Sequence, residues 1–121
     1  MKKKRGFTLI ELIIVIAILA LLIAIAIPRY QRSNLNAQAT AHNANVRVIK
    51  NAAILYSMDQ PTEGMIKLDD LKLYLESGEV PTPAKALKKD AFTVKADKGN
   101  IIVKPGMVKV KDGTLVEDAT E

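Results

Sequence analysis

Residues 6–28 read GFTLIELIIVIAILALLIAIAIP, and this stretch decides how the rest of the chain is organised. Every side chain at positions 7–27 is apolar except those of Thr8 and Glu11. A run of this length can cross a bilayer as one helix, for which about 20 residues are enough. We therefore predict a transmembrane helix over residues 7–28.

The positive charge of the chain is concentrated in front of this apolar run. Residues 1–6 contain four basic side chains, whereas residues 7–121 contain 14 basic and 13 acidic ones. The net charge of +5 therefore falls to +1 without the first six residues. Basic residues before an apolar helix mark the cytoplasmic side of a membrane. The charge indicates a leader at residues 1–6, and nucleic acid is not expected as a direct ligand.

Three interpretations of this N-terminal segment compete. A secretory signal peptide would be cleaved after Ala26, where Ala24 and Ala26 supply small residues. Its apolar centre, however, is usually only about 7–15 residues long. A plain membrane anchor leaves Glu11 unexplained, because a carboxylate deep in a membrane helix costs on the order of 2.5–3.5 kcal/mol.

Cleavage between Gly6 and Phe7, the third interpretation, supplies Glu11 with a partner. The new amine of Phe7 would place a positive charge one helical turn from Glu11. That amine could pair with Glu11 of its own chain or of a neighbouring chain. Pairing between chains would offset the cost of burying the carboxylate and would fix the axial register of the subunits.

The N-terminal motif resembles that of a known family. The sequence GFTLIEL at residues 6–12, followed by the apolar run to Pro28 and then by Tyr30, is similar to the N-terminus of type IV pilins and pseudopilins. The resemblance covers about the first 30 residues. Beyond them, it rests on the expected architecture of a helix packed on a small antiparallel sheet.

The resemblance implies a role for four residues. A prepilin peptidase would cut after Gly6, Phe7 would become the N-methylated first residue, and Glu11 would neutralise the N-terminus of a neighbour. The helix would loosen at Pro28 on assembly, since proline offers no N–H to the carbonyl one turn before it. Many members carry glycine where this chain has Ala20, and alanine favours a helix by about 1 kcal/mol over glycine. The loosened segment is therefore expected to be short.

Residues 29–121 are expected to form a globular head built on an amphipathic helix. Residues 30–58 contain neither Gly nor Pro, and their apolar side chains recur on one half of a helix, at about 100° per residue. The members of this apolar half are Val46, Val48, Ile49, Ala52, Ala53, Leu55 and Tyr56. Because this stretch adjoins the apolar run, we predict one helix from residue 7 to about residue 58.

The rest of the head is expected to be a short helix followed by strands. Residues 60–64 contain Pro and Gly and predict a break, and residues 68–77 predict a second helix. Alternating apolar residues over residues 91–116, separated by turns at residues 97–100, 105–106 and 112–113, predict an antiparallel β-meander of three or four strands. The fold class is therefore α+β, with the long helix packed on a small antiparallel sheet as in pilins. The chain has no cysteine, so no disulfide supports the small core.

Ordinary interpretations fit the remaining polar and aromatic clusters. His42, the only histidine, is expected to be a packed or half-exposed helix residue rather than a catalyst. The lysines at 85, 88 and 89 fit a solvated loop better than a DNA site. The C-terminal acids match no compact calcium loop and indicate a solvated tail. They are Asp112, Glu117, Asp118 and Glu121. Phe7, Tyr30 and Tyr56 are better explained by packing than by electron conduction.

These observations predict a structural filament subunit, not an enzyme, with no cofactor and no metal site. The expected partners are copies of the same chain, the prepilin peptidase, the pilus assembly platform with its ATPase, and the membrane. The precursor is expected in the cytoplasmic (inner) membrane and the mature chain in an extracellular filament. Two alternatives stay open: a pseudopilin of a type II secretion or competence system, and a secreted soluble binding module cleaved after Ala26.

Overall fold

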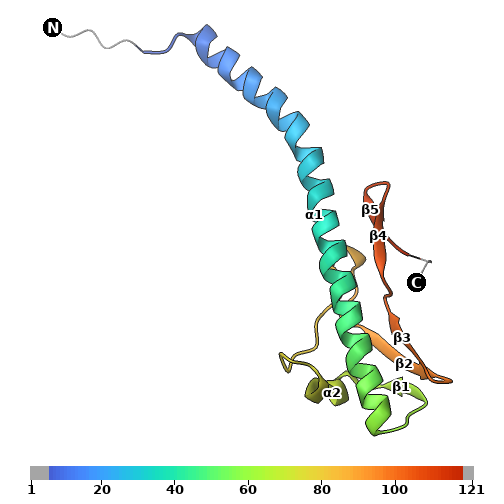
Figure 1. The fold of residues 1–121 in the computed structure, drawn as a ribbon. Helices are drawn as coiled ribbons and strands as arrows, with labels where there is room; N and C mark the ends of the chain where they lie inside the picture. Colours follow the sequence, from blue (N-terminus) through green and yellow to red (C-terminus); the bar gives the residue numbers. More distant parts are fainter. Residues whose placement is uncertain (1–5, 119–121) are drawn as a thin grey trace. The chain divides into compact units, whose positions relative to one another are not determined.

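The computed structural model describes residues 6–118, so residues 1–5 of the predicted leader and Glu121 of the acidic tail lie outside the described part. The chain divides into two compact units, Met1–Ser33 and Asn34–Glu121. One helix, α1 (Leu9–Asp59), contributes to both units, and all the strands lie in the second (Figure 1). The fold is thus a long N-terminal helix with small antiparallel sheets, which confirms the predicted α+β class and is consistent with a pilin fold.

Helix α1 contains 51 residues and begins two residues later than predicted. Its start is fixed by Thr8, which precedes the first helical residue and whose side chain is bonded to the first turn. It ends where Asp59 and Gln60 precede Pro61, a residue that disfavours helical geometry at the position before it. Pro28 lies inside α1, and helical geometry continues on both sides of it.

The strands form two separate sheets, so the prediction of a single meander is wrong. Three strands pair antiparallel in the order β1-β2-β3, namely β1 (Gly64–Ile66), β2 (Thr93–Asp97) and β3 (Asn100–Lys104). The second sheet is a hairpin of β4 (Val108–Lys111) and β5 (Thr114–Glu117). Pro105 and Gly106 separate the sheets, and a proline has no N–H with which to continue a ladder.

Both hairpins close with two-residue turns that require left-handed backbone. In the β2–β3 turn, Lys98 has φ +50° and Gly99 has φ +85°; in the β4–β5 turn, Asp112 has φ +51° and Gly113 has φ +74°. Two consecutive positive φ angles are typical of the turn whose twist matches that of the flanking strands. The predicted turns at these two places are confirmed, and they fix the register of each hairpin.

The second helix is shorter than predicted. Residues 68–77 were expected to be helical, but α2 ends at Leu71 (Leu68–Leu71) and continues only as the 3-10 turn η1 (Lys72–Tyr74). Leu75 then adopts extended backbone with ψ 134° and points into the core. A second 3-10 turn, η2 (Lys85–Leu87), precedes β2.

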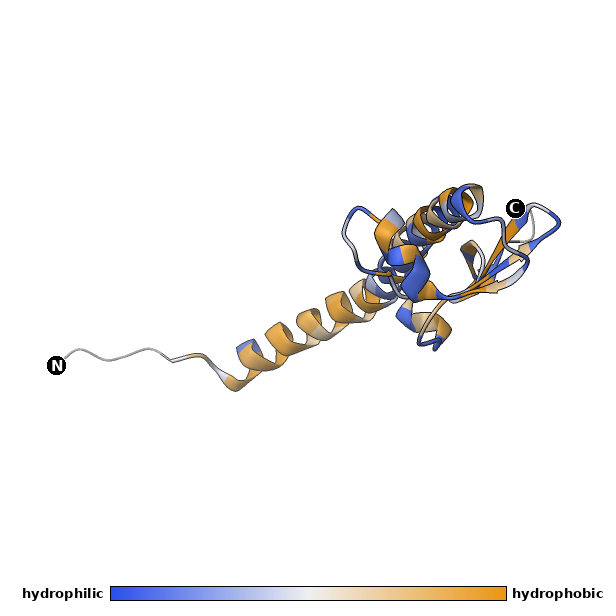
Figure 2. Ribbon diagram, turned by 90° about the horizontal axis from the view of Figure 1, so that it is seen from below, coloured by the Kyte–Doolittle hydropathy of each residue, from blue (hydrophilic) through white to orange (hydrophobic). Residues whose placement is uncertain are grey.

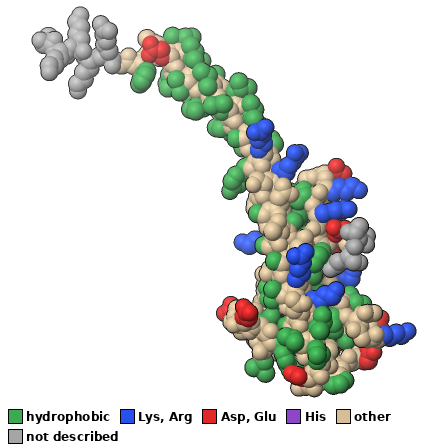
Figure 3. Space-filling model, in the orientation of Figure 1, with side chains coloured by type: hydrophobic (Ala, Val, Ile, Leu, Met, Phe, Trp, Pro, Cys, Tyr) green, Lys and Arg blue, Asp and Glu red, His purple; other side chains and the backbone are tan. Residues whose placement is uncertain are grey.

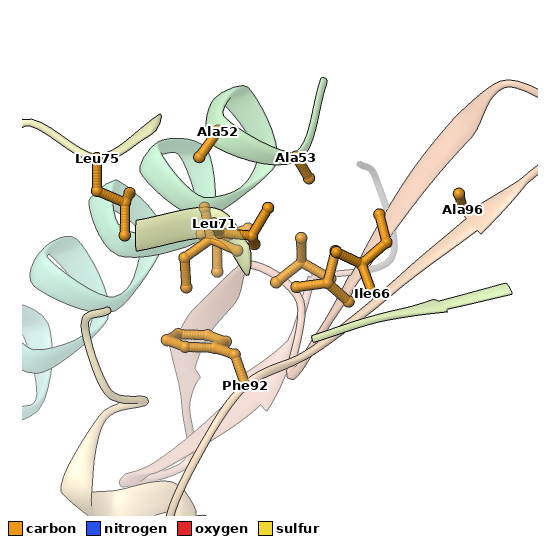
Figure 4. Packing of buried hydrophobic residues seen from close by; sticks show 11 residues of the cluster. Ala52, Ala53, Ile66, Leu71, Leu75, Phe92 and Ala96 are labelled. Atoms are coloured by element: carbon orange, nitrogen blue, oxygen red, sulfur yellow. The ribbon is translucent and has the colours of Figure 1, made fainter. Parts of the chain in front are cut away.

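The core of the head lies between α1, α2 and the three-stranded sheet. Figure 4 shows Leu71 between the helix residue Ala52 and Phe92, with the strand residue Ile66 beside them. Ile49, Val46 and Val94 are also fully buried in this cluster. Ala52 and Ala53 contribute small side chains to this cluster, and both are buried.

Two members of the predicted apolar half of α1 do not enter this core. Val48 is 47% exposed and Leu55 is 49% exposed, whereas Val46, Ile49, Ala52 and Ala53 are buried. Val48 and Leu55 lie at one edge of the half-circumference, where α1 borders residues 74–81 rather than the sheet. The buried part of the α1 circumference is therefore narrower than the half predicted from the sequence.

Candidate processing and assembly site

Gly6, Phe7 and Thr8 form a non-helical segment directly before α1. All three residues are exposed, and the Phe7 side chain is 86% exposed. No heavy atom lies within 4 Å of the position that a Cβ would take at Gly6. The peptide bond between Gly6 and Phe7 is therefore open to an enzyme that needs extended, accessible backbone.

Thr8 and Glu11 form a capping box at the start of α1. The Thr8 hydroxyl accepts a hydrogen bond from the Glu11 N–H at 3.2 Å, and the Glu11 carboxylate accepts one from the Thr8 N–H at 3.3 Å. These reciprocal bonds satisfy two of the backbone donors that a helix start leaves without partners. The carboxylate also lies at the positive end of the helix dipole.

The capping role of Thr8 is absent from the sequence predictions, although the sequence carried a signal for it. Thr8 and Glu11 stand in the spacing [ST]-x-x-[DE] before an apolar run, which is the pattern of a capping box. The structure gives Glu11 a function in the single chain, before any neighbour arrives. The capping box also orients the Glu11 carboxylate toward the Thr8 N–H. Thr8 follows Phe7, the residue at which cleavage would create an amine.

The apolar residues of α1 up to Ile27 are uncovered in the single chain. Figure 2 shows a nearly continuous apolar ribbon in this part of the helix, and Figure 3 shows apolar side chains along it. Its large apolar side chains are each about half exposed or more. By length and composition this helix could cross a membrane. A soluble monomer does not expose such a surface, so this helix requires lipid or other subunits.

His42 joins three parts of the head that are far apart in sequence. It is buried, its Nε2 lies 2.8 Å from the Gly106 carbonyl oxygen, and its Nδ1 accepts a hydrogen bond from the Ala84 N–H at 3.1 Å. Because Nδ1 is the acceptor, the proton is on Nε2, which donates to Gly106. The ring also contacts Phe92, with centroids 5.2 Å apart. This confirms the expectation of a packed helix residue.

Asn43, the next residue, attaches the β4–β5 hairpin to α1. Its side-chain amide donates to the Val108 carbonyl at 2.9 Å and accepts from the Val108 N–H at 2.7 Å. A two-stranded ribbon is only marginally stable alone. These two polar residues of α1 therefore position the hairpin, a function that no sequence motif signals.

We expect His42→Ala to lower the free energy of unfolding of the head by about 2–4 kcal/mol, because it leaves the Ala84 N–H and the Gly106 carbonyl without buried partners. Urea denaturation of residues 29–121 measures this. Thr40→Ala is the matched control on the same helix, since Thr40 is exposed and bonds only to the Asn36 carbonyl. A loss below about 0.5 kcal/mol for His42→Ala, the range of ordinary surface changes, would contradict the proposed anchoring role.

The other predicted clusters are not brought together into a site. Lys85, Lys88 and Lys89 are exposed around η2. Glu117 pairs with Lys104 at 3.7 Å and accepts from the Gly106 N–H, while Asp112 lies in a turn. Among residues 6–118, no group of three or more metal-ligating side chains lies close enough to hold an ion.

The aromatic residues considered for conduction are likewise dispersed. Phe7 and Tyr30 are exposed on different parts of the N-terminal region. Tyr56 instead packs edge-on against Tyr74 at 5.9 Å. The Tyr74 hydroxyl donates to the Asp59 carboxylate at 2.8 Å, and this bond raises the pKa of Tyr74 above its usual value. The contact fixes the segment after α2 against the end of α1.

An accessible peptide bond, a capped acidic first turn and an uncovered apolar helix together fit insertion of the N-terminal segment in a membrane. The chain matches the family described as the prokaryotic N-terminal methylation motif over residues 1–27. Among similar proteins, a fimbrial protein of Pseudomonas aeruginosa is 51% identical over 53 residues, which is 44% of this chain and 34% of that protein.

Two further relatives match shorter stretches of the chain. The prepilin peptidase-dependent protein D of Escherichia coli (strain K12) is 68% identical over 31 residues, 26% of this chain and 21% of its own. The fimbrial protein EcpB of Eikenella corrodens is 60% identical over 38 residues, 31% of this chain and 24% of its own. The match to these relatives thus spans about a third of their length or less. No solved structure matches the chain. These findings agree with the resemblance of the N-terminal segment to type IV pilins.

Proposed function

We propose that this chain is a structural subunit of a type IV pilus-like filament. In this proposal the precursor is inserted in the cytoplasmic membrane, cleaved after Gly6, N-methylated at Phe7 and polymerised through α1. The observation that carries the proposal is the exposed Gly6–Phe7 bond placed directly before the Thr8–Glu11 capping box and the uncovered apolar helix. The methylation motif matched at residues 1–27 supports the same sequence of events.

Each step of the proposal follows from a property of this segment. Hydrolysis of the Gly6–Phe7 peptide bond adds water, leaving a carboxylate on Gly6 and an amine on Phe7. The amine lies beside Thr8, whose N–H already donates to the Glu11 carboxylate. In a filament, the carboxylate would pair with the amine of a neighbouring chain, and the apolar side chains of α1 would leave lipid for one another. Loosening of α1 at Pro28 on assembly is part of this proposal.

The proposed partners are further copies of this chain or of related subunits, the prepilin peptidase, and the assembly platform with its ATPase. The proposed location is the cytoplasmic membrane for the precursor and the cell surface for the filament. The fimbrial relatives support this location. The role is structural, with no reaction carried out by the chain itself.

A pseudopilin of a secretion or competence system is the second candidate. It shares the methylation motif, and the relative from Escherichia coli is named for its dependence on prepilin peptidase, not for a fimbria. The soluble module cleaved after Ala26 is less well supported, because Ala26 lies inside α1 and inside the matched motif.

We expect the intact mass of the protein from its own cells to equal that of residues 7–121 with one added methyl group. Cells that lack the prepilin peptidase provide the control, since they should yield a chain that retains residues 1–6. A mature chain beginning at Ile27 would show that the pilin interpretation is wrong and that the secreted module is right.

A further inference from the structure

A groove with an apolar floor and an acidic rim runs along one flank of α1 in the head. It has a volume of about 720 Å³ and lies between α1 and residues 74–81. Val48 and Leu55, the two residues that the core leaves exposed, form part of its floor. Its only charged lining residues are Glu76 and Glu79. The Tyr74–Asp59 bond holds one end of its wall against α1.

The β4–β5 hairpin has an outer face of opposite charge. Lys109 pairs with Val116 across the two strands, and Lys111 pairs with Thr114, so these four side chains share one face. Both lysines and Thr114 are exposed, and Val116 is half-buried. The opposite face carries Val108, which is buried on the side toward Asn43. Among the described residues, the four side chains of this outer face combine two positive charges with apolar surface and include no acid.

The groove and the hairpin lie on opposite sides of α1. Figure 1 shows α2 and the loop after it on one side of the helix and the strands on the other. Figure 3 shows Lys and Arg side chains near the hairpin, with some Asp and Glu side chains among them, and a further group of Asp and Glu side chains across α1. The sequence reflects this division: residues 59–80 carry six acids and two lysines, and residues 84–111 carry eight lysines and two acids.

We propose that the groove of one copy receives the outer face of the β4–β5 hairpin of a second copy. Glu76 and Glu79 would face Lys109 and Lys111, while Val116 would cover the exposed floor at Val48 and Leu55. The contact joins two different surfaces of the same chain, and a head-to-tail contact of this kind gives an open filament when its rotation does not close a ring. Complementary charge would select the register of the heads, as it does in other interfaces. The inference rests on the proposed filament function.

Charge reversal in the full-length chain tests this contact. In cells that assemble the wild-type chain, Glu76→Lys/Glu79→Lys and Lys109→Glu/Lys111→Glu should each lower the yield of sheared filaments at least about fivefold, because like charges then face one another. The chain carrying all four changes should return to within about twofold of wild type, since the attraction is restored with the signs exchanged. Such a return excludes misfolding as the cause of the losses.

Asp69→Lys/Asp70→Lys is the matched control. These acids lie on α2 outside the groove, and the change in net charge is the same as in the groove variant. This control should assemble within about twofold of wild type, as expected of exposed charges without a partner chain. Wild-type yield from both reversals, or no recovery in the combined variant, would overturn the proposed contact.

Disulfide trapping gives a second, independent test because the chain contains no cysteine. Ser77→Cys lies on the groove wall and Thr114→Cys on the outer face of the hairpin. Oxidised filaments of the double variant should yield a ladder of covalent oligomers, whereas each single variant gives dimers at most. A double variant without a ladder would overturn the contact. If the wild-type chain forms no filament, the proposed function itself fails; if it does, only the head contact is at issue.

Discussion

Glu11→Ala should leave membrane insertion and removal of the leader intact but lower filament yield at least about tenfold. Removing the carboxylate lowers the cost of placing the helix in lipid, so insertion does not suffer. Assembly, however, would leave the Phe7 amine of a neighbour buried without its partner. Truncating one member of a buried charge pair costs about 2–5 kcal/mol, which is more than tenfold in an equilibrium constant. The measurement is the ratio of sheared filaments to processed subunit in the membrane.

Two further variants separate pairing between chains from capping within one chain. Glu11→Gln retains a hydrogen-bond acceptor without the charge and should give an intermediate yield. Thr8→Ala removes the hydroxyl of the capping box, at a cost of about 1 kcal/mol to the helix, but leaves the carboxylate in place. It should therefore reduce assembly much less than Glu11→Ala. Normal yield from Glu11→Ala, or equal losses from both alanine variants, would contradict the pairing mechanism.

Ile49→Asp should unfold the head, with a loss of more than about 4 kcal/mol in the free energy of unfolding. The Ile49 side chain is 0% exposed and packs in the core cluster, so an aspartate there is an unpaired charge in an apolar surrounding. Val46→Asp should act in the same way for the same reason. Residues 29–121 are expected to fold alone with modest stability, since the core is small and has no disulfide. Thermal melts of this fragment followed by circular dichroism provide the measurement.

Lys50→Asp is the neighbouring control for this prediction. Lys50 is exposed on the polar side of α1, about 100° around the helix from Ile49, so the same aspartate should change stability by no more than about 0.5 kcal/mol. Equal tolerance of aspartate at positions 49 and 50 would mean that the helix packs with another face. A fragment without a cooperative melt would mean that the head depends on residues 7–28.

The sequence was most informative where one physical pattern covers many residues. The apolar run and the amphipathic stretch after it predicted α1 to within two residues at each end. The turns at Lys98–Gly99 and Asp112–Gly113 were predictable because few residues tolerate two consecutive positive φ angles. Glu11 also pointed to the N-terminal segment, because a carboxylate inside an apolar membrane helix costs free energy unless it has a partner.

Features that depend on contacts distant in sequence could not be predicted. Strand β1 has only three residues and is recognisable only through its pairing with β2. The sheets separate at Pro105 and Gly106, but the position of the second sheet also rests on contacts from His42 and Asn43 to Gly106 and Val108, more than 60 positions away. Which residues of the apolar half of α1 are buried depends on the segments that pack against the helix. Periodicity alone therefore could not show that Val48 and Leu55 are exposed while Ile49 is buried. The capping box, by contrast, was readable in the sequence as T-x-x-E.

The capping box also bears on what happens when a subunit leaves the filament. A carboxylate whose only partner was a neighbouring chain would enter lipid without a hydrogen-bond partner. Extraction of the subunit from the filament would then include the full free-energy cost of placing that charge in lipid. In this chain the Thr8 N–H is available to the same carboxylate within one turn. When a subunit leaves the proposed filament, its Glu11 carboxylate would therefore exchange the bond to the neighbouring amine for the bond to the Thr8 N–H. In the proposed filament, subunits with this N-terminus would therefore suit withdrawal into the membrane and reuse in repeated cycles of growth and shortening.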